Sequence, residues 1–351
     1  MEFGIFHEFE RPSGMSEAQA FTNAFDLVEV AERGGLDAVW LAELHFNPRR
    51  SVLASPMLLA GAIGARTSNI KIGTAVQILP LCHPLQLAEE AATVDHISHG
   101  RLIFGVGRSG FARTYAAYGV PYAESRERFA ETLEIVRRAW TSDTFSFDGK
   151  YFQYHDVNVV PKPYQQPHPP IRVAATSPDT FPAIGAQGFD LFCAVRTGTL
   201  SELAPNLVAY RSAYAAAGHP GKGGVFLRVP VYVAASFDKA VEDTRDSIMG
   251  FYQQLGAQLE ASASEAGARA IEQRDVRGRR LRSVTFDEVL SEKVIVGTPE
   301  MVVSRLAAIS EELELDGILA ELNCGAQVPR EGVLEALRLL CSEVMPAFAT
   351  N

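Results

Sequence analysis

Short apolar runs alternate with longer amphipathic segments along the whole chain. Eight apolar runs read as buried strands, namely Phe3–Phe6, Ala38–Ala42, Ile70–Ala75, Leu102–Val106, Ile171–Ala175, Leu191–Val195, Phe226–Val233 and Gly317–Leu322. Helix-length segments lie between most of them, which is typical of βα units around a parallel sheet. Eight strands with interleaved helices predict an α/β protein with a (β/α)8 TIM-like barrel, because an open sheet usually has fewer strands.

The first helix is marked at both ends by its sequence. Apolar residues recur at helical spacing across Ala20–Arg33. Ser16 followed by Gln19 predicts a capping box at the start of this helix. Gly34 and Gly35 are expected to end it.

Two segments break the alternation. Residues 145–170 have strand-like patches, a DG turn and several prolines, which predicts an excursion on the barrel rim. Residues 256–293 are rich in Ala, Ser, Glu and Arg with little apolar period, which predicts an insertion after strand seven. A mobile lid and a disordered spacer are both compatible with this composition. Residues 1–351 are otherwise expected to form a single domain.

Composition restricts the class of protein. The chain has 351 residues, of which 47% are hydrophobic and 21% charged, as in ordinary globular proteins. No apolar run approaches the roughly 18 residues that a membrane span needs, and the start of the chain lacks a secretory pattern. We therefore expect a soluble, cytoplasmic protein without a membrane partner.

Charge and cysteine content argue against two further classes. The net charge of −10 disfavours nucleic-acid binding, and the basic cluster at 274–282 is expected to be a solvated loop. The four cysteines are scattered without a CxxC pair, so neither a disulfide framework nor a zinc site is expected. No HExxH or comparable ligand spacing occurs, and we predict no metal.

Polar residues follow several of the predicted strands. In a TIM-like barrel the active site forms at the carboxyl ends of the strands, so these residues are expected to converge. The residues just beyond the strands, all polar except Val76 and Gly107, are His7 and Glu8 after the first strand, Glu43 and His45 after the second, Val76 and Gln77 after the third, Gly107, Arg108 and Ser109 after the fourth, and Thr176, Ser177 and Thr180 after the fifth.

The segment GVGRSG, Gly105 to Gly110, fits the GxGxxG pattern of dinucleotide-binding folds. That fingerprint belongs in the first strand–helix turn of a βαβ unit, whereas this segment follows the fourth strand. We therefore reject the dinucleotide-binding interpretation. What remains is a set of glycyl amides beside the permanent charge of Arg108, which suits an anion.

Hydroxyl groups after the fifth strand could complete that anion site. Ser177 and Thr180 flank Pro178, which is placed to be the first residue of the next helix. An arginine, glycyl amides, hydroxyls and a helix N-terminus would together seat a phosphate monoester. A capped helix beside a surface arginine is the structural alternative.

Several longer stretches match a known family in order and spacing. They are MEFGIF at the start, GLDAVWLAELHF at 35–46, the segment 70–110, IRVAATSPDT at 171–180, VGTPEMVVSRL at 296–306, LDGILAELNCG at 315–325 and VMPAF at 344–348. The chain thereby resembles the bacterial luciferase-like family of flavin-dependent monooxygenases over nearly its whole length. The resemblance implies a TIM-like barrel with an insertion after strand seven.

The resemblance also implies a cofactor and partners. It suggests a two-component monooxygenase, in which a separate reductase supplies reduced FMN (FMNH2) and oxygen forms a flavin C4a-hydroperoxide that oxidises a small apolar organic substrate. Some branches use the deazaflavin F420 instead, so hydride transfer with F420 or FMN is an alternative. A non-catalytic flavin-binding protein is another. By analogy with the family, a homodimer is expected.

The resemblance assigns roles to particular residues. Glu43 and His45 match the segment at the reactive face of the flavin and are the predicted catalytic pair. Ala75 and Val76 match a position that often has a non-prolyl cis peptide beneath the flavin ring. The predicted cofactor-binding residues are Ala75, Val76, Gly107, Arg108, Ala175, Thr176, Ser177 and Thr180.

Two positions depart from the family pattern. Leu44 stands where light-emitting members have a catalytic histidine, and Gly107 replaces a reactive cysteine. Both changes argue against light emission. Acid–base chemistry would then fall to His45, with His7 or His83 as possible helpers, unless His45 is only a structural donor to Glu43.

Overall fold

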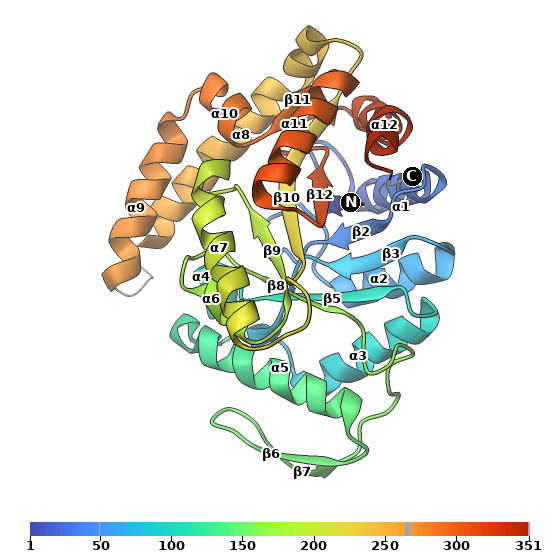
Figure 1. The fold of residues 1–351 in the computed structure, drawn as a ribbon, viewed down its shortest axis with the longest axis vertical. Coiled ribbons are helices and arrows are strands. Elements are labelled where there is room, and N and C mark those ends of the chain that lie inside the picture. The colour runs from blue at the N-terminus through green and yellow to red at the C-terminus, as the bar shows by residue number, and fades with distance from the viewer. Residues whose placement is uncertain (49, 264–267, 350–351) are drawn as a thin grey trace. The chain divides into compact units, whose positions relative to one another are not determined.

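The computed structural model describes residues 1–48, 50–263 and 268–349 (Figure 1). The chain divides into two compact units. The first comprises Met1–Trp40, Asn47–Val52 and Ala175–Asn351, and the second comprises Leu41–Phe46 and Leu53–Ala174. That 1–351 form one domain stays a prediction.

All of the predicted strands are present, each within one residue of its predicted ends. They are β1 (Glu2–His7), β2 (Ala38–Leu41), β3 (Lys71–Thr74), β5 (Leu102–Gly107), β8 (Ile171–Ala174), β9 (Asp190–Ala194), β10 (Val225–Val233) and β12 (Gly317–Glu321). Taken in this order, each strand neighbours the next, and β12 neighbours β1. The predicted closed parallel barrel is therefore confirmed.

Short additional strands extend this sheet. In the first unit, β11 (Ile295–Gly297) runs parallel to the end of β10, which also pairs with β9 and β12. In the second unit, β4 (Gln77–Ile78) pairs with the end of β5. Three barrel strands, β2, β5 and β12, are buried along their whole length, and the other five are buried except at one or two positions. This burial explains why the strands appear in the sequence as nearly continuous apolar runs rather than alternating ones.

The first helix, α1 (Glu17–Arg33), begins where the sequence predicts. The Ser16 side chain accepts a hydrogen bond from the backbone N–H of Gln19 at 3.1 Å. The reciprocal half of the predicted capping box is absent, because the Gln19 amide instead donates to Asn23 Oδ1 at 2.8 Å. Ser16 is therefore an ordinary N-cap.

The remaining helices of the barrel follow their strands. They are α2 (Pro56–Arg66), α3 (Pro84–Ile97), α4 (Ala112–Ala117), α5 (Ser125–Thr141), α6 (Thr180–Ala186), α7 (Leu200–Ala216), α11 (Pro299–Leu313) and α12 (Arg330–Leu339). Short 3-10 turns lie at Leu79–Leu81, Tyr122–Glu124 and Met345–Phe348, and one π turn at Leu340–Val344. Within the described residues, no helix is both long and apolar enough to cross a membrane.

The predicted insertion at 256–293 is mostly helical in the residues that the structure describes. It comprises the end of α8 (Phe237–Ala263), together with α9 (Ala268–Ser283) and α10 (Phe286–Glu292), and residues 264–267 lie outside the described residues. In Figure 1 α8 and α9 lie side by side, and a Cβ on Gly256 would come within 2.7 Å of the Gly278 carbonyl oxygen. Glycine at both positions thus permits close helix packing. A lid function stays a prediction.

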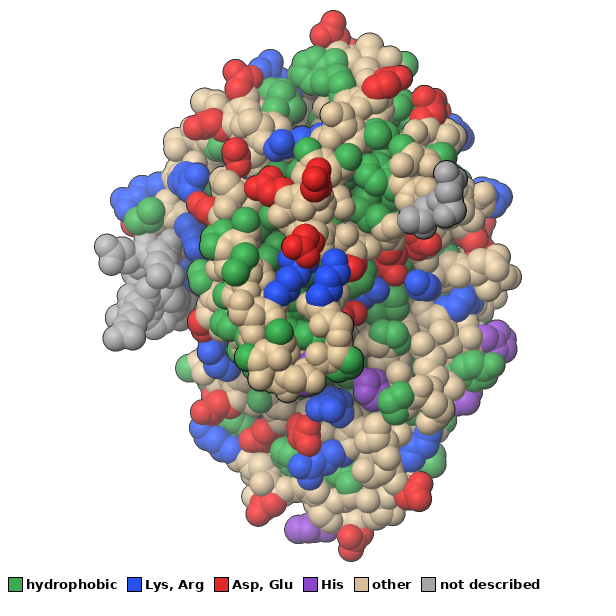
Figure 2. Space-filling view, in the orientation of Figure 1, with side chains coloured by type: hydrophobic (Ala, Val, Ile, Leu, Met, Phe, Trp, Pro, Cys, Tyr) green, Lys and Arg blue, Asp and Glu red, His purple; other side chains and the backbone are tan. Residues whose placement is uncertain are grey.

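The basic cluster at 274–282 lies in α9 and not in the expected loop. Arg280 pairs with Glu202 at 3.0 Å, and Arg282 pairs with Glu260 at 3.0 Å. The cluster is expected to be exposed to solvent, and Arg280 and Arg282 are exposed, each in an ion pair with a carboxylate. Figure 2 shows acidic and basic side chains interspersed on the visible face, rather than one large patch of either sign.

The predicted rim excursion contains a β-hairpin. Strands β6 (Phe145–Asp148) and β7 (Gln153–Val157) are antiparallel, with Asp148 opposite Gln153 across the DG turn. A proline-containing segment then leads to β8.

Candidate functional site

The segment after β2 carries the predicted catalytic pair. Glu43 Oε1 and His45 Nε2 are 2.8 Å apart, and the two side chains are only 5% and 7% exposed. Leu44 donates its backbone N–H to the Leu53 carbonyl at 2.9 Å, which fixes the chain between the two polar residues. The two side chains therefore contact one another, and their catalytic role stays a prediction.

The carboxylate of Glu43 also accepts hydrogen bonds from β4, the segment that follows the cis peptide. Its Oε2 accepts a hydrogen bond from Gln77 Nε2 at 2.8 Å and another from the Ile78 N–H at 2.7 Å. Burial raises the pKa of Glu43, and this effect outweighs the hydrogen bonds from His45 and Ile78 that lower it. Among the described residues no guanidinium or ammonium contacts this carboxylate, so Glu43 can take up a proton more readily than an ordinary glutamate.

His45 has a second partner on its other ring nitrogen. Nδ1 lies 3.2 Å from the hydroxyl of Tyr118, which is 48% exposed and follows α4. Arg113 donates to the Phe46 carbonyl and fixes the next residue of the segment. The imidazole is thus more than a donor to Glu43, because it links a buried carboxyl to a hydroxyl that reaches solvent.

A non-prolyl cis peptide joins Ala75 and Val76 at the end of β3, at the position that the resemblance indicates. The chain there is packed tightly: a Cβ on Gly107 would come within 2.6 Å of Val76 Cγ2. Thr74 Oγ1 donates to the Gly105 carbonyl at 2.6 Å and joins β3 to β5. Gly107 is therefore required by packing, which gives a physical reason for the absence of a cysteine at this position.

Gln77 follows the cis peptide and has one unsatisfied atom. Its Nε2 donates to Glu43 and, at 3.3 Å, to Cys82 Sγ. Its Oε1 is buried and has no hydrogen-bond partner among the described residues. A buried acceptor of this kind normally finds a donor.

Arg108 directly follows β5. Its backbone carbonyl accepts a hydrogen bond from the Tyr115 hydroxyl, and its Nη1 reaches Ser125 Oγ at 3.5 Å. In the described part of the chain no carboxylate pairs with this guanidinium. None of the described residues thus neutralises its charge through an ion pair.

The residues after β8 differ from the sequence prediction. Helix α6 begins at Thr180, so Pro178 lies in the preceding turn and not at the first helical position. The Thr180 hydroxyl donates to the Ser177 carbonyl at 2.6 Å. In this arrangement it cannot also donate to an anion. The local hydrogen bond closes a turn, which residue types alone do not reveal.

The other two predicted residues of this segment have different surroundings. Ala175 is buried, and its N–H donates to the Phe192 carbonyl at 2.9 Å. Thr176 is exposed. Cofactor binding by Ala175, Thr176, Ser177 and Thr180 stays a prediction.

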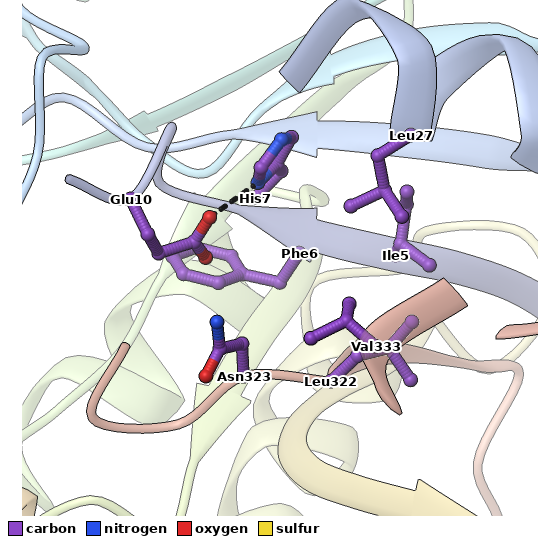
Figure 3. Close-up of a pocket in the computed structure, with 8 residues that line it drawn as sticks. All are labelled: Ile5, Phe6, His7, Glu10, Leu27, Leu322, Asn323 and Val333. Carbon is purple, nitrogen blue, oxygen red and sulfur yellow. Dashed lines mark ion pairs between the residues drawn. The ribbon is translucent and has the colours of Figure 1, made fainter. Parts of the chain in front are cut away.

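The two helper histidines have structural partners. His83 caps α3 by accepting from the Gln86 N–H at 3.4 Å. His7 Nδ1 pairs with Glu10 Oε2 at 3.0 Å, as the dashed line in Figure 3 marks. His7 lines a cavity of about 30 Å³, which has room for about a water molecule and not for a cofactor.

A second polar cluster occupies strand ends of the first unit. Arg50 binds Glu8 through two hydrogen bonds of 2.5 and 2.6 Å. Arg228, on β10, reaches the same carboxylate at 3.3 Å and binds Glu321, at the end of β12, at 2.7 and 3.0 Å. Burial alone would raise the pKa of Glu8, but Arg50 and Arg228 outweigh burial and hold the pKa at about 2.

Sequence reasoning included Glu8 but missed its partners. Arg228 interrupts the apolar strand FLRVPVYV, and Glu321 ends another apolar strand. A charge inside a buried strand predicts a buried partner of opposite sign, so this signal was present. Arg50 and Tyr118 lie in connecting segments and carry no comparable signal.

Comparison with known proteins agrees with this architecture. A family model described as "Luciferase-like monooxygenase" matches residues 1–316. The oxygenase component of the flavin-dependent trigonelline monooxygenase of Acinetobacter baylyi is 26% identical, covering 100% of this chain and 96% of that protein. An F420-dependent glucose-6-phosphate dehydrogenase of Kineococcus radiotolerans is 32% identical, covering 63% of this chain and 66% of the dehydrogenase.

A solved structure covers nearly all of both chains. The monooxygenase RslO1 of Streptomyces bottropensis has a TM-score of 0.80 and 27% identity, covering 99% of this chain and 100% of the other. Similar proteins thus include a flavin-dependent and an F420-dependent enzyme. Because the family model spans most of the sequence, the chain belongs to the luciferase-like monooxygenase family.

Proposed function

We propose that this protein is the oxygenase component of a two-component monooxygenase. A separate flavin reductase would supply reduced FMN, and the protein would use it with oxygen to oxidise a small organic substrate with an apolar body. The observation that carries the proposal is that Arg108, beside Gly107, has no carboxylate partner among the described residues. It belongs to the same unit as the buried Glu43–His45 pair. The full-length similarity to a flavin-dependent oxygenase component supports FMN over F420.

The residues of the second unit fit a flavin on two counts. The Arg108 guanidinium offers fixed donors and a permanent charge to a phosphate. The buried Gln77 Oε1 lacks a donor, and the ring system of a flavin carries N–H groups that can supply one. We propose that these two residues bind the cofactor. Ser177 and Thr180 stay predicted contributors, although the Thr180 hydroxyl would first have to leave Ser177.

Reduced FMN, when bound, would supply the electrons that activate oxygen. The chain's own part is to move protons. An ionised Glu43 accepts the Nε2 hydrogen of His45, which leaves Nδ1 to accept from the Tyr118 hydroxyl. Protonation of Glu43 at Oε1 would reverse both hydrogen bonds and make Nδ1 the donor.

That exchange is a relay from a buried carboxyl to a half-exposed hydroxyl. It lets the protein deliver or remove one proton beside the cis peptide without admitting bulk water. The raised pKa of Glu43 favours the relay, because a carboxyl that protonates readily can change state during a reaction.

An anaerobic titration tests the choice of cofactor. Reduced FMN and reduced F420 are titrated separately into the protein, and air is then admitted while hydrogen peroxide is measured. We expect tight binding of reduced FMN and slower peroxide release than from free FMN. The Arg108→Ala variant should bind FMN at least about tenfold more weakly, since a charged hydrogen bond contributes about 1.5–3 kcal/mol.

The other outcomes decide between the alternatives. Selective binding of reduced F420, with no effect on oxygen, would identify hydride transfer, the activity class of the Kineococcus relative. Binding of oxidised FMN that cannot be reduced would indicate a non-catalytic flavoprotein. Co-purification with a reductase and a dimeric mass in solution would test the two partners that the sequence predicts.

A further inference from the structure

Arg196, which follows β9, carries unsatisfied donors in a buried place. Its Nε and Nη2 are buried and have no hydrogen-bond partner among the described residues. The hydroxyl of Tyr252, on α8, is also buried and lacks a partner among them. Buried donors of this kind are rare in native proteins and need a partner. A guanidinium only donates, so what Arg196 lacks is an acceptor, and the Tyr252 hydroxyl, which is close enough to Arg196 to be affected by its charge, can donate to the same acceptor.

The charges around Arg196 are unbalanced. Its electrostatic neighbours are the arginines Arg50 and Arg228 and the glutamates Glu8 and Glu321. Within this set, three guanidinium groups and two carboxylates leave one positive charge, before the nearby Lys293 ammonium is counted. The carboxylates are already taken, because both are hydrogen-bonded by Arg50 or Arg228. Burial and the two other arginines lower the pKa of Arg196 to about 10, so it stays protonated at neutral pH.

The loop that carries Arg196 is fixed in place. Lys293, which directly follows α10, donates to the carbonyl of Gly198 and reaches that of Val195 at 3.5 Å. Phe251 lies against Arg196 and Arg50, with its ring centroid 5.5 and 5.2 Å from their guanidinium carbons. A fixed guanidinium over an apolar ring is a preorganised site for an anion, because little further ordering is needed on binding.

From these observations we propose that Arg196 and Tyr252 bind the carboxylate of an organic acid. A single negative charge balances the cluster, which favours a carboxylate over a doubly charged phosphate. Phe251 provides an apolar surface beside it, so the ligand combines one carboxylate with an apolar or aromatic body. That this acid is the substrate rests on the proposed function, and it narrows the predicted substrate class from apolar compounds to amphiphilic acids.

Thermal unfolding in the absence of flavin tests the proposal. The melting temperature is measured in sodium acetate and sodium benzoate against sodium chloride at equal ionic strength, with benzamide as the neutral analogue. Both carboxylates should raise the melting temperature of the wild type by a few degrees, and benzamide should not. In Arg196→Gln the increment should disappear, while the ligand-free protein melts at the same or a higher temperature because an unpaired buried charge is gone.

Two control variants show whether the effect is specific to Arg196. Arg280→Gln, on the exposed face of α9, should keep the carboxylate increment. Arg50→Gln should lower the ligand-free melting temperature, because it removes the main partner of Glu8. The proposal is overturned if the wild type shows no increment, or if Arg196→Gln keeps it. Since no flavin is present, these results are independent of whether the cofactor is FMN.

Discussion

Two buried glutamates at strand ends of this barrel have opposite acid–base behaviour. Glu43 and Glu8 each have a side chain that is 5% exposed, yet the pKa of Glu43 is raised and that of Glu8 is about 2. The difference lies in their partners. Glu43 is bound by an imidazole, an amide and a backbone N–H, whereas Glu8 is bound by two guanidinium groups.

Burial acts to raise the pKa of both carboxyls, so the difference between them is decided by the fixed cations beside Glu8. Glu43 suits proton transfer because its neighbours can change their own protonation state or hydrogen-bond direction. Glu8 is locked in its charged form and suits the fixing of an electrostatic field. This contrast supports the proposal that the chemistry takes place at the Glu43 site and that the cluster around Glu8 serves ligand recognition.

The largest expected effect comes from Glu8→Gln. This change leaves Arg50 without its bidentate partner and adds a further uncompensated charge to the cluster. Breaking a buried ion pair on one side costs about 3–5 kcal/mol of stability. Urea unfolding at neutral pH measures it, with Glu17→Gln on exposed α1 as the control. A loss below about 1 kcal/mol would show that Glu8 does not hold the cluster together.

The pH dependence of the free energy of unfolding tests the low pKa of Glu8. Its folded pKa of about 2 lies below the ordinary 4.5, so the unfolded chain binds more protons between these values. The stabilisation is present above about pH 5 and is lost as the pH falls toward 2, an effect on the order of 3 kcal/mol. Urea unfolding across this window should show a steep loss in the wild type and a shallower one in Glu8→Gln. Equal slopes would contradict the low pKa.

Glu43→Gln should have the opposite signature. Its folded pKa is raised, so its contribution to stability is present at low pH and declines as the pH rises from 4.5 through the raised pKa. In the variant the free energy of unfolding should not show this decrease with rising pH, as measured by urea unfolding over the same pH range. Substrate oxidation with reduced FMN should fall about a hundredfold, because the glutamine amide cannot relay a proton to His45. Full activity in this variant would remove Glu43 from the relay.

Tyr118→Phe should give the smallest effect. The change removes the hydroxyl 3.2 Å from His45 Nδ1 but keeps the aromatic contact between the two rings. Stability should change by less than about 1 kcal/mol, and the rate of substrate oxidation should fall by about fivefold, since water can replace a half-exposed hydroxyl. Tyr164→Phe, another exposed tyrosine, serves as the control. A loss as large as that of Glu43→Gln would make Tyr118 the essential proton donor.

The sequence predicts the barrel well because its strands are continuous apolar runs of characteristic length. It predicts the Glu43–His45 pair because both residues directly follow one strand. The helix α9 could not be predicted because its apolar residues do not recur at helical spacing. Its packing against α8 depends on the close approach at Gly256 and Gly278, which the local sequence does not indicate. The capping box fails because the Gln19 side chain has a local competitor in Asn23.

Long-range pairing could not be predicted from residue types. Glu8 and Arg228 are 220 residues apart, and only the closure of the barrel brings them together. Likewise the Thr180 hydroxyl is taken by the Ser177 carbonyl, a choice made by the backbone of one turn. Such contacts depend on geometry that no local pattern encodes.

One measurement tests whether the cofactor binds at Arg108 while the Arg196 cluster binds a different ligand. The Kd for reduced FMN is determined by anaerobic fluorescence titration of the wild type, Arg108→Ala and Arg196→Gln. We expect Arg108→Ala to weaken binding at least about tenfold and Arg196→Gln to leave the Kd unchanged. An unchanged Kd in Arg108→Ala, or an equal loss in Arg196→Gln, would contradict the account.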